Sequence, residues 1–170
     1  MKKEAFKDLK IRVITLSDRA SQGIYPDKSG LLIKEILETY FSTTSWKYQI
    51  EYNLIPDNEA QLTDLLLKST QNKEDIVITT GGTGVGPRDF TPEVIKKFPV
   101  KEITGIMENI RTKYGSEKPN ALLSRGIAGV ISETQIYALP GSAKAVNEYM
   151  TEILKTLEHL VFMIHGIDIH

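Results

Sequence analysis

Residues 75–93 of the chain read DIVITTGGTGVGPRDFTPE. The first six of these residues are mostly apolar and β-branched, which predicts a buried strand. Four glycines lie within positions 81–86, directly after that strand. Thr91, Pro92 and Glu93 then predict the start of a helix, with Thr91 as its N-cap and Pro92 at its first position. The segment therefore has the order strand, glycine-rich loop, helix.

The alternation of strands and helices continues on both sides of this segment. The other predicted elements are strands at 10–18, 50–55, 127–131 and 135–139, and helices at 28–41, after residue 58, at 102–114 and after an N-cap at Ser142. This order predicts one α/β domain over residues 1–170, a three-layer α/β/α sandwich with a mostly parallel sheet. The last two strands are short and close together, so we expect them to add an antiparallel edge.

Composition and charge narrow the class of protein. The chain has 170 residues, of which 41% are hydrophobic and 25% charged, as in ordinary globular domains. The net charge of −1 argues against a broad basic face for nucleic acid. The absence of cysteine excludes disulfides, zinc ribbons and thiol nucleophiles, and fits a cytoplasmic protein. The apolar run at 160–164 is too short to cross a membrane, so we expect no membrane as a partner. The balanced charge leads us to expect no nucleic acid as a partner either.

The glycine-rich loop is the strongest chemical signal. Its glycines allow the backbone to approach a ligand closely, and their N–H groups can form an anion-binding nest. The spacing matches neither a P-loop nor the dinucleotide fingerprint. Asp89 follows the loop just before the predicted helix. The alternative is a tight turn in which Asp89 is only a local cap.

Three more loops carry unusual residues, and all of them follow predicted strands. Ligands of parallel sheets bind beyond the carboxyl ends of the strands. The stretch at 54–59, LIPDNE, places Asp57 at such an end. Asp57 and Asp89 beside a phosphate nest indicate a Mg²⁺ site, because Mg²⁺ prefers a few carboxylates together with phosphates and water. The alternative is that Asp57 or Asn58 only caps the next helix.

The loops after residues 16 and 139 are weaker signals. The polar residues of the first, LSDRASQGIYPDKSG at 16–30, are Ser17, Asp18, Arg19, Asp27, Lys28 and Ser29. Arg19 or Lys28 could contact a phosphate. The alternative is that the loop is only solvated and that Asp27 caps the helix that follows. The second, LPGSAK at 139–144, has the form of a phosphate-binding helix N-terminus or of a plain strand–helix junction.

Several motifs together resemble one family. SDRASQGIYPDKSG, LIPD, ITTGGTGVGPRDFTPE, LLSR and LPGSAKA occur here in the order and spacing of the Mog/MoaB family, which includes molybdopterin adenylyltransferase and the gephyrin G domain. The resemblance covers about residues 10 to 160. It implies an α/β/α homotrimer that acts late in molybdenum cofactor synthesis, with a molybdenum insertase as a possible later partner. The implied reaction is Mg²⁺-dependent transfer of AMP from ATP to molybdopterin, with release of diphosphate.

The resemblance also implies the site residues. Asp57 and Asp89 match the family's essential aspartates, which serve catalysis and Mg²⁺ binding, with Asp89 the more critical. The residues implied in binding nucleotide or pterin are Ser17, Asp27, Gly30, Thr80, Gly81, Gly82, Thr83, Gly84, Ser124, Arg125, Gly141, Ser142 and Lys144.

Two other functions remain open at this point. A non-catalytic trimer of the same family would bind molybdopterin as a scaffold and release no diphosphate. A general nucleotide-dependent transferase would use the same nest without selectivity for a pterin. The intact SDR and IPD motifs resemble the active Mog branch of the family more than the MoaB branch.

Overall fold

The computed structural model describes residues 8–167 of the chain. Its elements are β1 (Leu9–Leu16), α1 (Asp18–Ser21), α2 (Ser29–Ser42), β2 (Tyr48–Ile55), α3 (Glu59–Gln71), β3 (Ile76–Thr80), α4 (Thr91–Lys96), β4 (Val100–Glu102), α5 (Thr104–Gly115), the 3₁₀ helix η1 (Pro119–Leu123), β5 (Ile127–Ile131), β6 (Thr134–Leu139) and α6 (Ala143–Ile164). The predicted strands and helices are all present, and the bounds predicted for them are wrong by at most two residues. The sequence does not predict α1, β4 or η1, because such short elements carry no periodic pattern.

The sheet has six strands in the order β2-β1-β3-β6-β5-β4. β1 pairs in parallel with β2 and β3, and β3 pairs in parallel with β6. β5 runs antiparallel to both β6 and β4. The predicted parallel sheet with an antiparallel edge is therefore confirmed. β3 and β6 are buried along their whole length, which explains why their sequences lack the alternation of a half-exposed strand.

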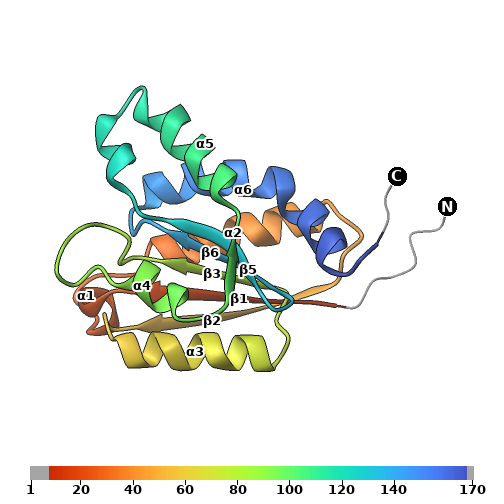
Figure 1. The fold of residues 1–170 in the computed structure, drawn as a ribbon. Helices are drawn as coiled ribbons and strands as arrows, with labels where there is room; N and C mark the ends of the chain where they lie inside the picture. The colour runs from red at the N-terminus through yellow and green to blue at the C-terminus, as the bar shows by residue number, and fades with distance from the viewer. Residues whose placement is uncertain (1–7, 168–170) are drawn as a thin grey trace.

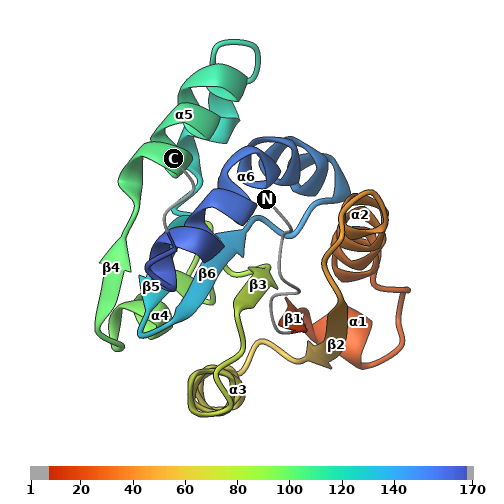
Figure 2. The ribbon, with the colours of Figure 1, turned by 90° about the vertical axis from the view of Figure 1, so that its right-hand side faces the viewer.

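Helices cover both faces of this sheet, which confirms the three-layer arrangement (Figures 1 and 2). α3 and α4 lie on one face, and α2, α5 and α6 lie on the other. Each face has its own apolar core, and α6 contributes the longest buried stripe, consisting of Val146, Tyr149, Met150, Ile153, Leu157 and Val161. Within residues 8–167, no helix is both long enough and apolar enough to cross a membrane.

Three helix starts decide which side chains remain available to a ligand. Ser142 caps α6 and accepts from the Ala145 amide over 3.2 Å, as predicted. Asn58 caps α3, so the carboxylate of Asp57 is not used for that purpose. The prediction that Thr91 caps α4 is wrong. The N-cap is Phe90, and the Thr91 hydroxyl instead donates to the carbonyl oxygen of Gly81 over 2.9 Å.

The four parallel strands end at one edge of the sheet. In the strand register Leu16 lies opposite Ile55, Thr15 opposite Thr80, and Thr80 opposite Leu139. The loops that follow β1, β2, β3 and β6 therefore begin side by side. These are the four loops in which the sequence places its candidate site residues.

Candidate active site

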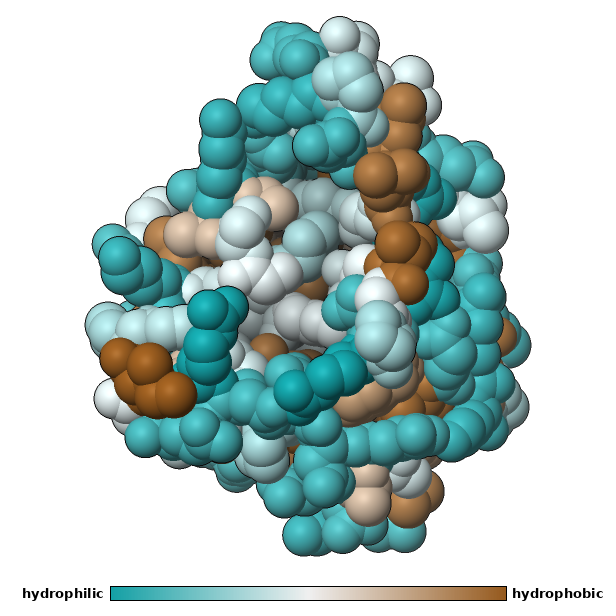
Figure 3. Space-filling view, turned by 90° about the vertical axis from the view of Figure 1, so that its left-hand side faces the viewer, coloured by the Kyte–Doolittle hydropathy of each residue, from teal (hydrophilic) through white to brown (hydrophobic). Residues whose placement is uncertain are grey.

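A pocket of about 890 Å³ lies where these loops meet. Its walls come from the loop after β1, the start of α2, the loop after β2, the glycine-rich loop after β3 and the start of α6. Figure 3 views the molecule from this edge and shows residues of neutral hydropathy in the middle of the face, with hydrophilic residues around them. We call this space the first pocket.

A second pocket of about 540 Å³ adjoins the first. Gly82, Asp89 and Gly141 line both pockets and so form a shared wall. The second pocket also contains the side chains of Lys118 and Lys144. The two spaces are large enough for two small-molecule substrates held next to each other.

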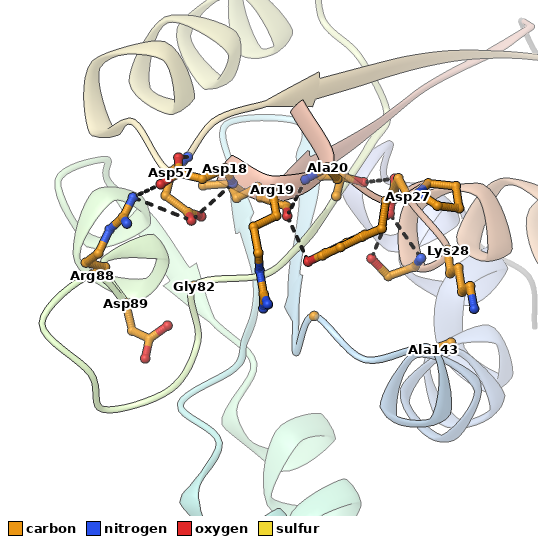
Figure 4. A pocket seen from close by; sticks show the side chains of 17 residues that line it. Asp18, Arg19, Ala20, Asp27, Lys28, Asp57, Gly82, Arg88, Asp89 and Ala143 are labelled. Carbon is orange, nitrogen blue, oxygen red and sulfur yellow. Dashed lines mark hydrogen bonds and ion pairs between the residues drawn. The ribbon is translucent and has the colours of Figure 1, made fainter. Parts of the chain in front are cut away.

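Asp18 and Asp57 form a close pair at the wall of the first pocket (Figure 4). The Asp57 amide donates to Oδ1 of Asp18 over 2.9 Å, and the Asp18 amide lies 3.4 Å from Oδ2 of Asp57. The guanidinium of Arg88 forms an ion pair with Asp18 and lies 3.8 Å from Oδ2 of Asp57. This hydrogen-bonded ion pair lowers the pKa of Asp18 and raises the pKa of Arg88, so both groups are charged at neutral pH.

Asp89 is held by its own loop. Its Oδ2 accepts from the Gly86 amide over 2.8 Å. A Cβ atom at Gly84 would lie 2.6 Å from the same oxygen, so the loop closes around this carboxylate and needs glycine there. In Figure 4 the side chain of Asp89 points away from the Asp18–Asp57 pair. One of the amides expected to form an anion nest therefore already binds the protein's own carboxylate.

Arg125 fastens the glycine-rich loop from outside the pockets. Its Nε donates to the carbonyl oxygen of Gly84 over 2.6 Å, and its Nη2 donates to that of Asp89 over 2.8 Å. Its Nη1 forms an ion pair with Glu93 on α4. All three nitrogens of the guanidinium thus contact the protein itself. Arg125 therefore positions the loop instead of lining either pocket.

Asp27 is likewise bound on both carboxylate oxygens. Thr15 and Tyr52 donate to Oδ2, each over 2.6 Å, while the amides of Ser29 and Gly30 donate to Oδ1. The pKa of Asp27 is lowered, because these hydrogen bonds together outweigh desolvation by burial, which acts in the opposite direction as the largest single cause. Asp27 thus holds the first turn of α2, although the N-cap residue of that helix is Lys28 and not Asp27.

The structure separates the expected site residues into three groups. The first pocket is lined by Ser17, Asp27, Asp57, Gly82, Asp89 and Gly141. The second is lined by Gly81, Gly82, Thr83, Gly84, Asp89, Ser124, Gly141, Ser142 and Lys144. Neither is lined by Gly30, Thr80 or Arg125. Thr80 is buried and donates to the carbonyl oxygen of Pro140 over 2.8 Å, and a Cβ at Gly30 would meet Thr15 and Asp27.

The carboxylates of the first pocket fit Mg²⁺ bound together with a phosphate ligand. Among residues 8–167, no three His, Cys, Asp or Glu side chains are grouped so that they could hold a metal ion alone. Mg²⁺ does not require such a cage, because it is commonly held by one or two carboxylates, substrate phosphates and water. Asp18 and Asp57 supply two carboxylates on one wall of a pocket of nucleotide size.

Sequence reasoning missed the roles of Asp18 and Arg88. Asp57 was expected to act with Asp89, yet its carboxylate partner in the structure is Asp18. The signal for Asp18 was present, because it follows the end of β1 just as Asp57 follows the end of β2. No local pattern indicates that Arg88, seventy positions from Asp18, turns toward it.

The fold and the two adjoining pockets define an α/β protein that binds small molecules at the carboxyl ends of its parallel strands. Residues 12–159 match the family described as "Probable molybdopterin binding domain", and the chain belongs to that family. The resemblance drawn from the motifs is therefore confirmed.

Individual relatives agree with this assignment. The chain is 36% identical over 157 residues to a molybdopterin adenylyltransferase of Helicobacter pylori, covering 92% of this chain and 88% of the relative. It is 35% identical to gephyrin of Dictyostelium discoideum, but there it spans only 22% of the relative's length. The crystal structure of the tungsten cofactor synthesizing protein MoaB from Pyrococcus furiosus superposes with a TM-score of 0.81 at 33% identity, covering 94% of this chain and 99% of that one.

Proposed function

We propose that this protein transfers AMP from ATP to molybdopterin, giving adenylyl-molybdopterin and diphosphate. The observation that carries the proposal is the pair of pockets with a shared wall of Gly82, Asp89 and Gly141. Transfer between two bound molecules is fast only when the reacting groups are held in contact. Relatives that share most of this chain carry the name of the same activity.

The nucleotide occupies the first pocket in this proposal. Asp18 and Asp57 would hold Mg²⁺ there, and the ion, when bound, would neutralise charge on the phosphates. Arg19 and Lys28 line the same pocket and can contact phosphate oxygens. The pocket volume of about 890 Å³ is sufficient for a nucleoside triphosphate.

Molybdopterin occupies the second pocket. Lys144 supplies positive charge for its terminal phosphate, while the charge of Lys118 is paired with that of Glu148, which lines the same pocket. Ser142 is the N-cap of the 22-residue helix α6 and lines this pocket, so the positive end of the helix dipole faces the anion. The hydroxyl of Tyr149 donates to that of Ser124 over 2.9 Å, and both residues line this pocket.

The reaction follows from this placement. An oxygen of the terminal phosphate of molybdopterin attacks the α-phosphorus of ATP, and the bond from that phosphorus to the oxygen bridging to the β-phosphate breaks. The electron pair leaves with diphosphate, so no covalent intermediate with the protein is needed. The protein contributes position and charge, which are the main requirements of phosphoryl-type transfer. Asp89 lies in the shared wall and is thus beside both reacting phosphates.

Replacement of Asp89 tests the proposal. In Asp89→Asn the side chain keeps an acceptor oxygen for the Gly86 amide, so the loop is expected to hold its shape. With Mg-ATP and molybdopterin, we expect product formation to fall by at least about a hundredfold, as for loss of a charged group at a reacting centre. Adenylyl-molybdopterin and diphosphate are both measured. Asp64→Asn removes the same charge from an exposed position on α3 and should leave the rate unchanged.

Other outcomes separate the alternatives. Wild-type product formation in Asp89→Asn would contradict the assigned site. Molybdopterin binding without any product, in the wild-type protein, would favour a scaffold of the same family. Equal transfer to unrelated phosphate acceptors would favour a general nucleotide-dependent transferase.

A homotrimer and an insertase as partner are parts of the proposal that rest on the resemblance, and a cytoplasmic location is a part that rests on the absence of cysteine. The exposed apolar side chains Leu122 and Leu123 on η1 and Met163 on α6 are candidate contact residues between copies. Light scattering on the purified protein measures the mass, and a monomer at micromolar concentration would contradict the trimer.

A further inference from the structure

The ion pair of Arg88 has a feature that an ordinary surface salt bridge lacks. Its guanidinium contacts the two carboxylates that the proposed function assigns to Mg²⁺. The carboxylates follow the ends of two different strands, and the backbone amide of each aspartate contacts the carboxylate of the other. Arg88 comes from a third loop, between β3 and α4. The cation thus lies at the position where the acidic pair attracts positive charge most strongly.

The side chain of Arg88 can change its rotamer although the backbone of its loop is held in place. The neighbouring residue Asp89 is held through its amide, carbonyl and carboxylate groups by Gly86 and Arg125. The Arg88 side chain itself is 65% exposed. Turning the guanidinium away from the acidic pair therefore needs rotation of an exposed side chain and no rearrangement of the loop backbone.

Two cations cannot share these carboxylates without cost. A divalent ion within contact distance of Asp18 and Asp57 would repel a guanidinium at the same oxygens. The two carboxylates, in contrast, already face one and the same nitrogen of the guanidinium, so a cation at that place reaches both without rearrangement of the acidic pair. Exchange of one cation for the other is the simplest way for the pair to accept a metal.

We propose that Arg88 is a built-in counter-ion that occupies the divalent-cation position between Asp18 and Asp57, and that Mg²⁺ must displace it. The inference rests on the proposed function, which gives the metal its role. It has two consequences. Arg88 weakens cation binding in the absence of nucleotide. Its displacement frees a guanidinium, a group suited to phosphate oxygens, at the wall of the first pocket.

Binding of Mn²⁺ to the protein without nucleotide or pterin tests this exchange. Mn²⁺ replaces Mg²⁺ and its free concentration is measured by electron paramagnetic resonance. In Arg88→Gln we expect Mn²⁺ to bind about fivefold more tightly, the factor that corresponds to loss of an exposed ion pair. Arg88→Lys keeps the charge and should bind Mn²⁺ nearly as the wild-type protein does.

Two further variants locate the effect. Lys96→Gln removes one positive charge from an exposed residue of α4 and controls for net charge, so its Mn²⁺ affinity should be unchanged. Asp18→Asn should weaken Mn²⁺ binding and, combined with Arg88→Gln, should abolish the gain. Circular dichroism of each variant checks that the fold is intact.

Either of two results would overturn the inference. One is an Arg88→Gln protein that binds Mn²⁺ no more tightly than the wild type. The other is a gain that persists in the double variant with Asp18→Asn, which would place the ion elsewhere. Because these titrations contain no substrate, they do not depend on adenylyl transfer. Failure of the activity assay and failure of the cation exchange are therefore observed separately.

Discussion

Single residues of this site act mainly on one another. Asp27 binds the start of α2, and Arg125 binds the carbonyl oxygens of Gly84 and Asp89. Such residues match family motifs because they shape the pocket walls. A motif residue near a ligand site is therefore not always a ligand contact.

Arg125 provides a prediction about this shaping role. Arg125→Lys keeps the charge but loses the planar fork that reaches Gly84, Asp89 and Glu93 together. We expect kcat to fall by about tenfold to a hundredfold, because the loop and Asp89 lose their position. Amide hydrogen exchange of residues 81–90 should become faster in parallel.

Glu93→Gln serves as the comparison for Arg125→Lys. It removes only the ion pair outside the loop and leaves both carbonyl contacts of Arg125 in place. Its kcat should stay within about twofold of the wild type, as for loss of an exposed salt bridge. A loss as large as that of Arg125→Lys would mean that charge near α4, and not the hold on the loop, is what matters.

Among the helices, α5 is joined to α6 by a buried carboxylate in addition to the apolar core that the two helices share. Glu152 on α6 accepts from Lys113 of α5 over 2.6 Å and from Lys155 of its own helix over 2.7 Å. These two hydrogen bonds lower the pKa of Glu152 from its ordinary 4.5 to about 2. Since α5 leads into η1 at the second pocket, this attachment also supports the proposed pterin site.

The pH dependence of this attachment follows from the direction of the shift. A carboxylate whose pKa is lower in the folded state stabilises the fold above its unfolded pKa, and this contribution is lost as the pH falls from about 4.5 to about 2. We expect Glu152→Gln to lower the free energy of unfolding by about 1–3 kcal/mol at pH 7. Urea unfolding should show the difference shrinking below pH 4.5.

The exposed Glu108 on α5 offers the matched control for this experiment. Glu108→Gln should change the free energy of unfolding by less than about 0.5 kcal/mol at any pH. If Glu152→Gln were equally neutral at pH 7, the attachment of α5 to α6 would have to be attributed to apolar packing alone.

On the scale of the whole molecule, the two ends of the parallel strands differ: one end carries the pockets, and the part of the sheet away from it carries a network of buried charges. The pockets lie beyond the carboxyl ends of the parallel strands. Towards the opposite edge, the buried Arg12 of β1 donates to Glu74, just before β3, and to Asn53 of β2. Its guanidinium also lies 2.8 Å from Glu51 of β2. This network ties three strands together away from the site.

Breaking this network should affect stability more than chemistry. Arg12→Met leaves the carboxylate of Glu74 buried without its main partner, which costs about 3–5 kcal/mol. The double variant with Glu74→Gln removes the unpaired charge and should recover part of the loss. Urea unfolding measures the free energy of unfolding of both variants. The kcat of the folded protein should be unchanged. A parallel fall in kcat would show that the Arg12 network and the pockets are coupled.

Much of this molecule follows from patterns within short stretches. Buried strands, the stripe of α6 and the N-cap at Ser142 depend on residues close in sequence, so period and capping rules find them. The same rules, with the parallel order of the strands, bring Asp57, Asp89 and the glycine-rich loop to one edge. These rules do not find the short β4, because three residues carry no periodic pattern and the strand is defined by its pairing with β5.

The partners of the site residues could not be found in this way. Asp18 meets Asp57 across thirty-nine positions and Arg88 across seventy, and both contacts require β1, β2 and β3 to lie side by side in one register. Which loop amide Asp89 accepts from, and which carbonyls Arg125 reaches, likewise depends on the path of a loop that local preferences leave open. Residue types and strand ends are properties of short segments, whereas the pairing of charges is a property of the packed sheet.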